Sequence, residues 1–182
     1  RSAMTPKLKR LFIAIIVIQV VFLLGIVGYR EAILINGRTA ILQTVPVDPR
    51  DLFKGEYVTL RYEISTLSNR VDSGSKRYLL RGEIDDADTV YVTISNVDKD
   101  ELSLDVQTDG PTDRTDLFIK GKVTSQKAGI ITIEYGIEQY FVPEGRGLEI
   151  EQADDVKVRV KINRSGTAAI EALIVDGEDW QP

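Results

Sequence analysis

The longest run of apolar residues lies near the N-terminus of the chain. Between Leu11 and Val27 the only polar side chain is Gln19. Counted to Tyr29, an α-helix of this segment rises about 1.5 Å per residue and spans roughly 28 Å, close to the hydrocarbon thickness of a bilayer. Because a helix of a soluble protein usually keeps one polar face, this run predicts a transmembrane helix over residues 11–30.

The charges around this run predict its orientation. Lys7, Lys9 and Arg10 come directly before it, and positive residues are retained on the cytoplasmic side. We therefore expect a single-pass protein of the cell membrane, with residues 1–10 cytoplasmic and residues 31–182 extracytoplasmic (periplasmic or extracellular). Residues 11–30 would be a signal anchor that contacts the lipid bilayer through residues 11–29.

Two alternatives to a retained anchor stay open. A cleaved signal peptide has a shorter apolar region that ends in small residues, and the sequence after Gly25 offers no such site. The second alternative is a buried core helix, but a helix of a soluble protein seldom stays apolar on every face over a run of this length.

After the anchor, apolar positions recur with a period of two, which is typical of strands with one buried face. The clearest case is residues 156–162, where Val or Ile alternates with Lys or Arg. On this strand we expect one buried face, formed by Val156, Val158, Val160 and Ile162, and one exposed face, formed by Lys157, Arg159 and Lys161. The turn residues 163–166 lead into a further strand over residues 167–175, so this pair predicts a hairpin.

Similar alternation marks strands throughout the extracytoplasmic part. They are expected at residues 57–64, 90–94, 102–106, 117–119, 131–137, 156–162 and 167–175. Short helical pieces are expected at residues 49–53 and 147–153. Because turn residues separate the strands, the sequence predicts a mainly β fold: a single N-terminal transmembrane helix followed by an antiparallel β-sandwich or barrel-like domain with one or two short helices.

Composition narrows the possible functions. After residue 30 the chain has 18 Lys and Arg against 28 Asp and Glu, a net charge of −10, which argues against nucleic acid as a partner. There is no His and no Cys, so imidazole catalysis, thiol catalysis and disulfides are excluded. We therefore expect no catalytic residue, no metal and no cofactor.

The most distinctive local segment is residues 46–62. Its prolines bracket an extended turn, in which Asp48 can cap a short helical piece before a strand begins. Tyr57 and Tyr62 point to opposite faces of that strand, since their spacing is odd. With Leu60, Tyr62 is expected in the core.

Within this segment, residues 55–62 (GEYVTLRY) resemble the signature of the GDYxxLxY family of bacterial membrane-anchored proteins, with Glu56 in place of the family's Asp. The preceding residues 46–53 and the later element 140–145 (YFVPEG) also resemble the family, so the similarity runs from the anchor to Gly177. Members of the family often appear with multi-pass membrane proteins. The resemblance therefore implies an extracytoplasmic interaction module, anchored in the membrane, with a multi-pass membrane protein as partner.

Charged and aromatic residues around the motif are the candidate binding site. The candidate residues are Arg50, Glu56, Tyr57, Arg61 and Glu144. The alternative is a structural role for the charged residues of this region. Asp48 and Asp51 can cap a turn while Arg50 pairs with one of them, and turn chemistry alone explains residues of these types at these positions. The alternative function is a cell-envelope hydrolase or a ligand-binding domain that uses the same carboxylates and arginines.

Two further patterns resemble known kinds of site. Residues 105–116 follow the acidic order of a calcium loop, but strands flank them and Asp116 is too short for the usual bidentate Glu. A solvated hairpin connection is therefore predicted there. The anchor and β-domain also resemble the layout of type I signal peptidases, whose Ser-x-Met element is absent; Ser65, Ser68 and Ser125 with Lys127 have no spacing that supports a serine–lysine dyad.

Overall fold

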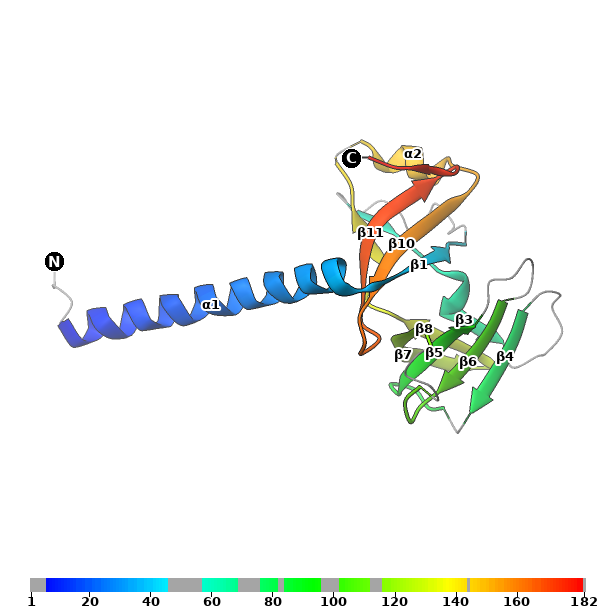
Figure 1. Cartoon of the computed structure of the whole chain (residues 1–182), viewed down its shortest axis with the longest axis horizontal. Helices are drawn as coiled ribbons and strands as arrows, with labels where there is room; N and C mark the ends of the chain where they lie inside the picture. Colours follow the sequence, from blue (N-terminus) through cyan, green and yellow to red (C-terminus); the bar gives the residue numbers. More distant parts are fainter. Residues whose placement is uncertain are drawn as a thin grey trace.

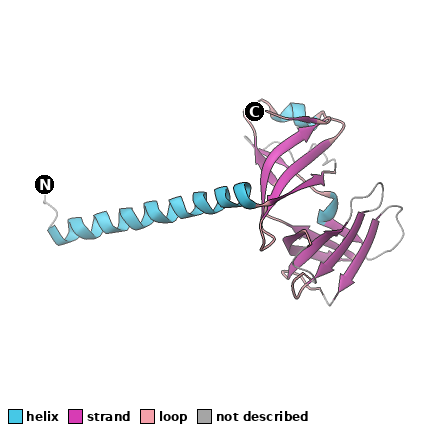
Figure 2. Ribbon diagram, viewed as in Figure 1, coloured by secondary structure: helices cyan, strands magenta, loops and turns pink. Residues whose placement is uncertain are grey.

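A long helix projects from a body of β-sheets (Figure 1). The computed structural model describes residues 6–45, 57–68, 76–81, 84–95, 102–111, 116–143 and 145–181. The helix, α1, comprises Pro6–Asn36, and the only other α-helix among the described residues is α2 (Gly147–Glu151). Figure 2 shows that strands make up most of the body, which confirms the mainly β prediction.

Helix α1 is long and apolar enough to cross a membrane, and the most apolar part of it is not buried at all. A core helix would be covered by the rest of the fold, so that alternative is wrong. The helix runs six residues past its expected end. In its last turns it packs on the β-body, where Ile33 is only 4% exposed.

Gly37 joins α1 to the first strand. Its amide donates to the carbonyl oxygen of Ile33 at 2.8 Å. A Cβ at Gly37 would lie 2.5 Å from that oxygen and 3.0 Å from the backbone nitrogen of Ile162. A residue with a side chain therefore does not fit without a backbone shift, and the helix meets the sheet with no linker between them.

One sheet lies beside the end of α1. Its order is β1-β10-β11-β12, all antiparallel. The strands are β1 (Arg38–Gln43), β10 (Val156–Ile162), β11 (Ala168–Val175) and β12 (Glu178–Asp179). The predicted β10–β11 hairpin is confirmed.

Three of the four residues predicted on the buried face of β10 are buried, namely Val158, Val160 and Ile162, whereas Val156 at the start of the strand is only half-buried, so that part of the prediction is wrong. Its cations Lys157, Arg159 and Lys161 are half-buried, so the prediction that they are exposed is wrong. On the outer face of the sheet, each cation forms an ion pair with a carboxylate. These ion pairs are Lys157–Asp155 at 2.8 Å, Arg159–Asp179 at 2.7 Å and Lys161–Glu171 at 3.7 Å.

The second large sheet has six strands in the order β3-β8-β7-β5-β6-β4. They are β3 (Thr66–Ser68), β4 (Lys76–Arg81), β5 (Thr89–Ser95), β6 (Leu102–Gln107), β7 (Phe118–Lys127) and β8 (Ile130–Glu134). The pairings are antiparallel except β4–β6, which is parallel. The antiparallel prediction thus holds for all of this sheet but one pair.

The segment between β6 and β7 is not a hairpin connection. Both strands pair with β5, which lies between them, so the chain must cross the end of β5. The hairpin predicted for residues 105–116 is therefore wrong, because consecutive strands are not always neighbours in a sheet.

A small sheet joins the two large ones. It pairs β2 (Tyr57–Thr59) with β9 (Gln139–Phe141), and a short 3₁₀-helix, η2 (Glu63–Ser65), follows the motif strand. A single apolar core runs through all three sheets, including Leu42, Tyr62, Val92 and Val160. The helix predicted near residues 147–153 is α2, whereas the one predicted at residues 49–53 lies outside the described residues.

Candidate functional site

The motif strand has one face in the core and one face outward. Val58, Leu60 and Tyr62 are buried, the last with 1% of its surface exposed. Tyr57 is half-buried and Arg61 is exposed. The alternation predicted from the tyrosine spacing is therefore confirmed, and Tyr62 with Leu60 is the core pair.

Backbone hydrogen bonds tie this strand to two distant segments. Beyond its pairing with β9, the Leu60 amide donates to the Glu138 carbonyl oxygen at 2.7 Å. On the other side, the Val45 amide donates to the Arg61 carbonyl oxygen at 2.8 Å. The motif strand thus lies between β9 and the segment that follows β1, and it is hydrogen-bonded to both.

Two buried tyrosines fasten the end of the motif. The Tyr62 hydroxyl donates to the Ile137 carbonyl oxygen, and the Tyr135 hydroxyl donates to the Ile64 carbonyl oxygen at 2.7 Å. Burial raises the pKa of both hydroxyls above its ordinary value, and the carboxylate of Glu138 adds to the shift. Both groups therefore stay neutral, as a donor to a buried carbonyl must.

Ser65 also has a structural role. Its hydroxyl accepts from the Tyr62 amide at 3.3 Å, and its own amide donates to the Tyr62 carbonyl oxygen at 2.9 Å. Ser65 is the last residue of η2 and is buried, so its hydroxyl has no access to solvent for a nucleophilic role.

The outer face of the motif strand carries the candidate binding residues that the structure describes. Tyr57 lies opposite Phe141 in the β2–β9 pair, with ring centroids 6.2 Å apart in an edge-on arrangement. Phe141 is 72% exposed. Of the predicted site residues, Tyr57 and Arg61 therefore share this outer face; the others, Arg50, Glu56 and Glu144, lie outside the described residues, as do Asp48 and Asp51.

A groove of about 710 Å³ lies beside this face, where α1 leaves the β-body. One wall is the last part of α1, the floor is the segment from β8 to β9, and the other wall is the start of β11. Its lining includes Ile26, Tyr29 and Arg30 from α1, Glu134 and Glu138 from the floor, and Phe141. Sequence reasoning missed the groove, because no local pattern shows that β11 and β9 flank the helix.

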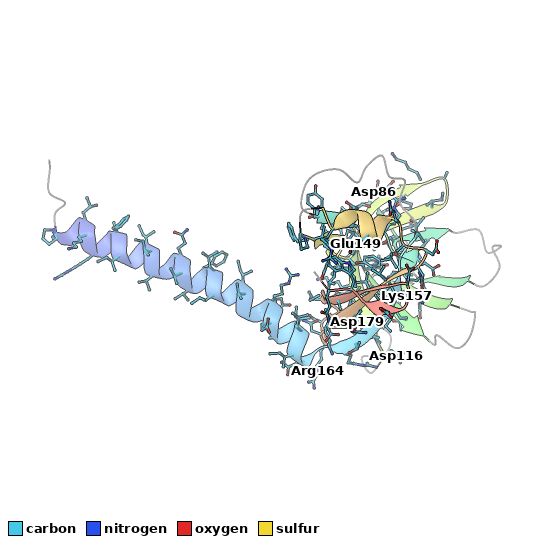
Figure 3. All side chains as sticks on the ribbon, turned by 90° about the horizontal axis from the view of Figure 1, so that it is seen from above. Asp86, Asp116, Glu149, Lys157, Arg164 and Asp179 are labelled. Atoms are coloured by element: carbon cyan, nitrogen blue, oxygen red, sulfur yellow. The ribbon has the colours of Figure 1, made fainter. Side chains whose placement is uncertain are left out.

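The β10–β11 turn touches the helix at the same place. The side-chain amide of Asn163 donates to the Tyr29 hydroxyl at 3.3 Å. Figure 3 labels the next residue, Arg164, close to the end of α1. This hydrogen bond and the packing of Ile33 hold the end of α1 against the β-body, where the helix forms one wall of the groove.

A second cluster, also not predicted, holds the C-terminal segment. The Arg146 guanidinium lies 5.3 Å from the centre of the Trp180 ring and donates twice to the Glu149 carboxylate at 2.8 Å. These hydrogen bonds from Arg146, followed by one from Trp180, lower the pKa of Glu149. Tyr140 packs edge-on against Trp180. The cluster is held by its own partners, and we assign it a structural role.

The described residues contain no group of three or more His, Cys, Asp or Glu that could hold a metal ion. In the calcium-like segment, Asp105 and Gln107 lie in strand β6, and the Gln107 side-chain amide donates to Asp105 at 3.0 Å. A strand does not curl its side chains around one point as a calcium loop does.

Comparison with known proteins agrees with the motif. No curated protein and no solved structure matches the chain. The sequence model of one family, described as GDYXXLXY protein, matches residues 19–173. This range begins inside α1 and ends in β11, so it takes in the second half of the helix, the motif strand and the groove. The chain therefore belongs to the GDYXXLXY family.

Proposed function

We propose that this protein is a single-pass membrane protein whose extracytoplasmic β-domain binds a multi-pass membrane protein. One observation carries the proposal: α1 exposes apolar side chains on all sides and then packs directly on the β-body at Ile33. A helix with this surface is stable only in a non-aqueous environment. The β-domain is therefore held next to the bilayer.

Contacts at the end of α1 support a retained anchor over a cleaved signal peptide. Ile33 is buried in the β-body, and Tyr29 accepts a hydrogen bond from Asn163. Cleavage near Arg30 would separate Tyr29 from the domain that it contacts. Lys7, Lys9 and Arg10 favour a cytoplasmic N-terminus, so the domain faces the other side of the membrane.

The outer face of the motif strand supports binding rather than catalysis. It presents the half-buried ring of Tyr57 and the exposed side chain of Arg61. Aromatic residues and arginine are enriched at protein–protein interfaces and supply most of the binding energy there. The association of GDYxxLxY proteins with multi-pass membrane proteins agrees with a partner in the same membrane.

Co-purification tests the partner. The full chain, tagged after Pro182, is purified in a mild detergent, and the proteins that accompany it are identified. We expect a multi-pass membrane protein, lost with Arg61→Ala or Tyr57→Ala. Lys127→Ala, an exposed cation at the end of β7, is the matched control. Arg61→Ala and Lys127→Ala, both at exposed positions, should keep the free energy of unfolding within about 0.5 kcal/mol of the wild type. Tyr57→Ala also loses the ring contact with Phe141 and should still fold.

Two results would contradict this proposal. One is recovery of the same partner at wild-type level with both Arg61→Ala and Tyr57→Ala. The other is a topology result: a reporter that works only outside the cytoplasm, fused after Pro182, should be active, and N-terminal sequencing should find α1 retained. A soluble form that begins near Arg30 would show a cleaved signal peptide instead.

A further inference from the structure

The junction between α1 and the β-body fixes the height of the domain above the membrane. Ile33 is buried, and the Gly37 amide bonds back to Ile33. Gly37 leaves no room for a side chain between the helix and β10. Because no flexible linker separates the anchor from the domain, the same face of the domain always meets the bilayer.

The groove opens on that face. Its helical wall begins at Ile26, one residue before the apolar run ends at Val27, and continues to Ile33. The seven helical steps from Ile26 to Ile33 rise about 10 Å. If α1 spans the bilayer, this wall passes from the edge of the hydrocarbon through the headgroup layer. The floor of the groove then lies at headgroup depth.

The groove has the chemistry of that layer. Tyr29 and Phe141 are 56% and 72% exposed, and aromatic rings are enriched at the interface between hydrocarbon and water. Arg30 supplies a positive charge, whereas Glu134 and Glu138 supply negative charges. A zwitterionic phospholipid presents a phosphate and an ammonium group, which match these two signs. Anionic lipids fit less well, since the chain after residue 30 has a net charge of −10.

We propose that this groove seats the headgroups of zwitterionic phospholipids of the adjacent leaflet, and that Phe141 inserts among them. The proposal rests on the membrane anchoring proposed above. It assigns the groove to lipid and leaves the outer face at Tyr57 and Arg61 to the protein partner.

Fluorescent labels at two positions test the proposal. The chain has no Cys, so Phe141→Cys and Ile41→Cys each give one labelling site. Ile41 is the matched control, because it is an exposed apolar residue (54%) in β1, which leads away from α1 (Figure 1). It lies four residues beyond Gly37, about 13 Å along an extended strand. Thr39→Cys, exposed in the same strand, is a second control if Ile41→Cys folds poorly.

The labelled full-length chains are reconstituted without any other protein into phosphatidylcholine vesicles that contain a lipid spin-labelled at its headgroup. We expect the label at residue 141 to be quenched at least three-fold more than the label at residue 41. We also expect Arg30→Ala to reduce this quenching, and vesicles rich in phosphatidylglycerol to give less of it than phosphatidylcholine.

The outcomes separate this inference from the proposed function. Flotation of the protein with the vesicles tests the anchor by itself; a chain that does not float refutes the anchoring. A chain that floats with equal quenching at residues 141 and 41 refutes the lipid groove alone. A label at residue 141 that becomes shielded from solvent only after a multi-pass partner is added would show that a protein occupies the groove. That result also refutes the proposal.

Discussion

Replacing Tyr62 by Phe tests whether the final tyrosine of the family signature has a structural role. The ring of Tyr62 stays in the core, so no cavity forms, but the hydroxyl that donates to the buried Ile137 carbonyl oxygen is lost. An unsatisfied buried acceptor costs about 1–3 kcal/mol. In a domain of this size that lowers the melting temperature by roughly 2–4 °C per kcal/mol.

The pH dependence gives a sharper result than the loss at neutral pH. Burial raises the pKa of Tyr62 in the folded state above the ordinary value of 10.0. A raised pKa stabilises the fold fully below the ordinary pKa, and this contribution is lost as the pH rises above it. At pH 11 the unfolded tyrosine has released its proton while the folded one has not, which costs the wild type about 1.4 kcal/mol. Phe has no proton to release, so the gap between wild type and Tyr62→Phe should shrink by that amount between pH 9 and pH 11.

Chemical unfolding of the full chain in detergent micelles, followed by circular dichroism, measures both quantities. Tyr135→Phe should behave in the same direction, because its hydroxyl donates to the Ile64 carbonyl oxygen and its pKa is also raised. Tyr57→Phe, in a half-buried ring, is the control and should change the neutral-pH stability by less than about 0.5 kcal/mol. A gap between wild type and Tyr62→Phe that stays constant to pH 11 would refute the buried-hydroxyl argument.

Three further predictions concern the junction and the β10 sheet. Gly37→Ala should destabilise the full chain by about 1–3 kcal/mol in thermal unfolding, because its Cβ would contact backbone atoms, whereas Gly28→Ala, with no atom nearby, should be neutral. Val158→Asp should abolish folding, as judged by circular dichroism, because it buries a charge. Arg159→Glu exchanges the Asp179 ion pair for a repulsion between carboxylates on a partly exposed face and should still fold; equal stability of the two variants would contradict the strand assignment. The Arg159 guanidinium lowers the pKa of Asp179, so this pair stabilises the fold above the ordinary pKa of 3.8 and is lost as the pH falls below it. Asp179→Asn should therefore flatten the acid side of a pH–stability curve, and a curve that is unchanged there would show that the pair contributes nothing.

The sequence was most informative where a feature depends on local periodicity. The apolar run at residues 11–27, the alternation in β10 and the odd spacing of Tyr57 and Tyr62 each predicted a structure that is present. Each of these patterns repeats within one element, so neighbours in the chain suffice to show it.

Features that depend on distant segments were not predicted. The segment between β6 and β7 was expected to be a hairpin because the strands are consecutive, but β5 lies between them. Arg159 was expected to be exposed, and Asp179, twenty residues away, partly covers it. The groove likewise needs α1, β9 and β11 together, and no single segment shows that arrangement.

The two faces of the motif strand explain how one short signature can serve both the fold and a surface. Leu60 and Tyr62 face the core, whereas Tyr57 faces outward and pairs across the strands with Phe141. Because Phe141 also lines the groove, the outer face of the motif begins where the groove ends. With the membrane anchoring proposed above, a partner that contacts Tyr57 and Arg61 would approach close to the bilayer surface, within reach of the short loops of a multi-pass protein.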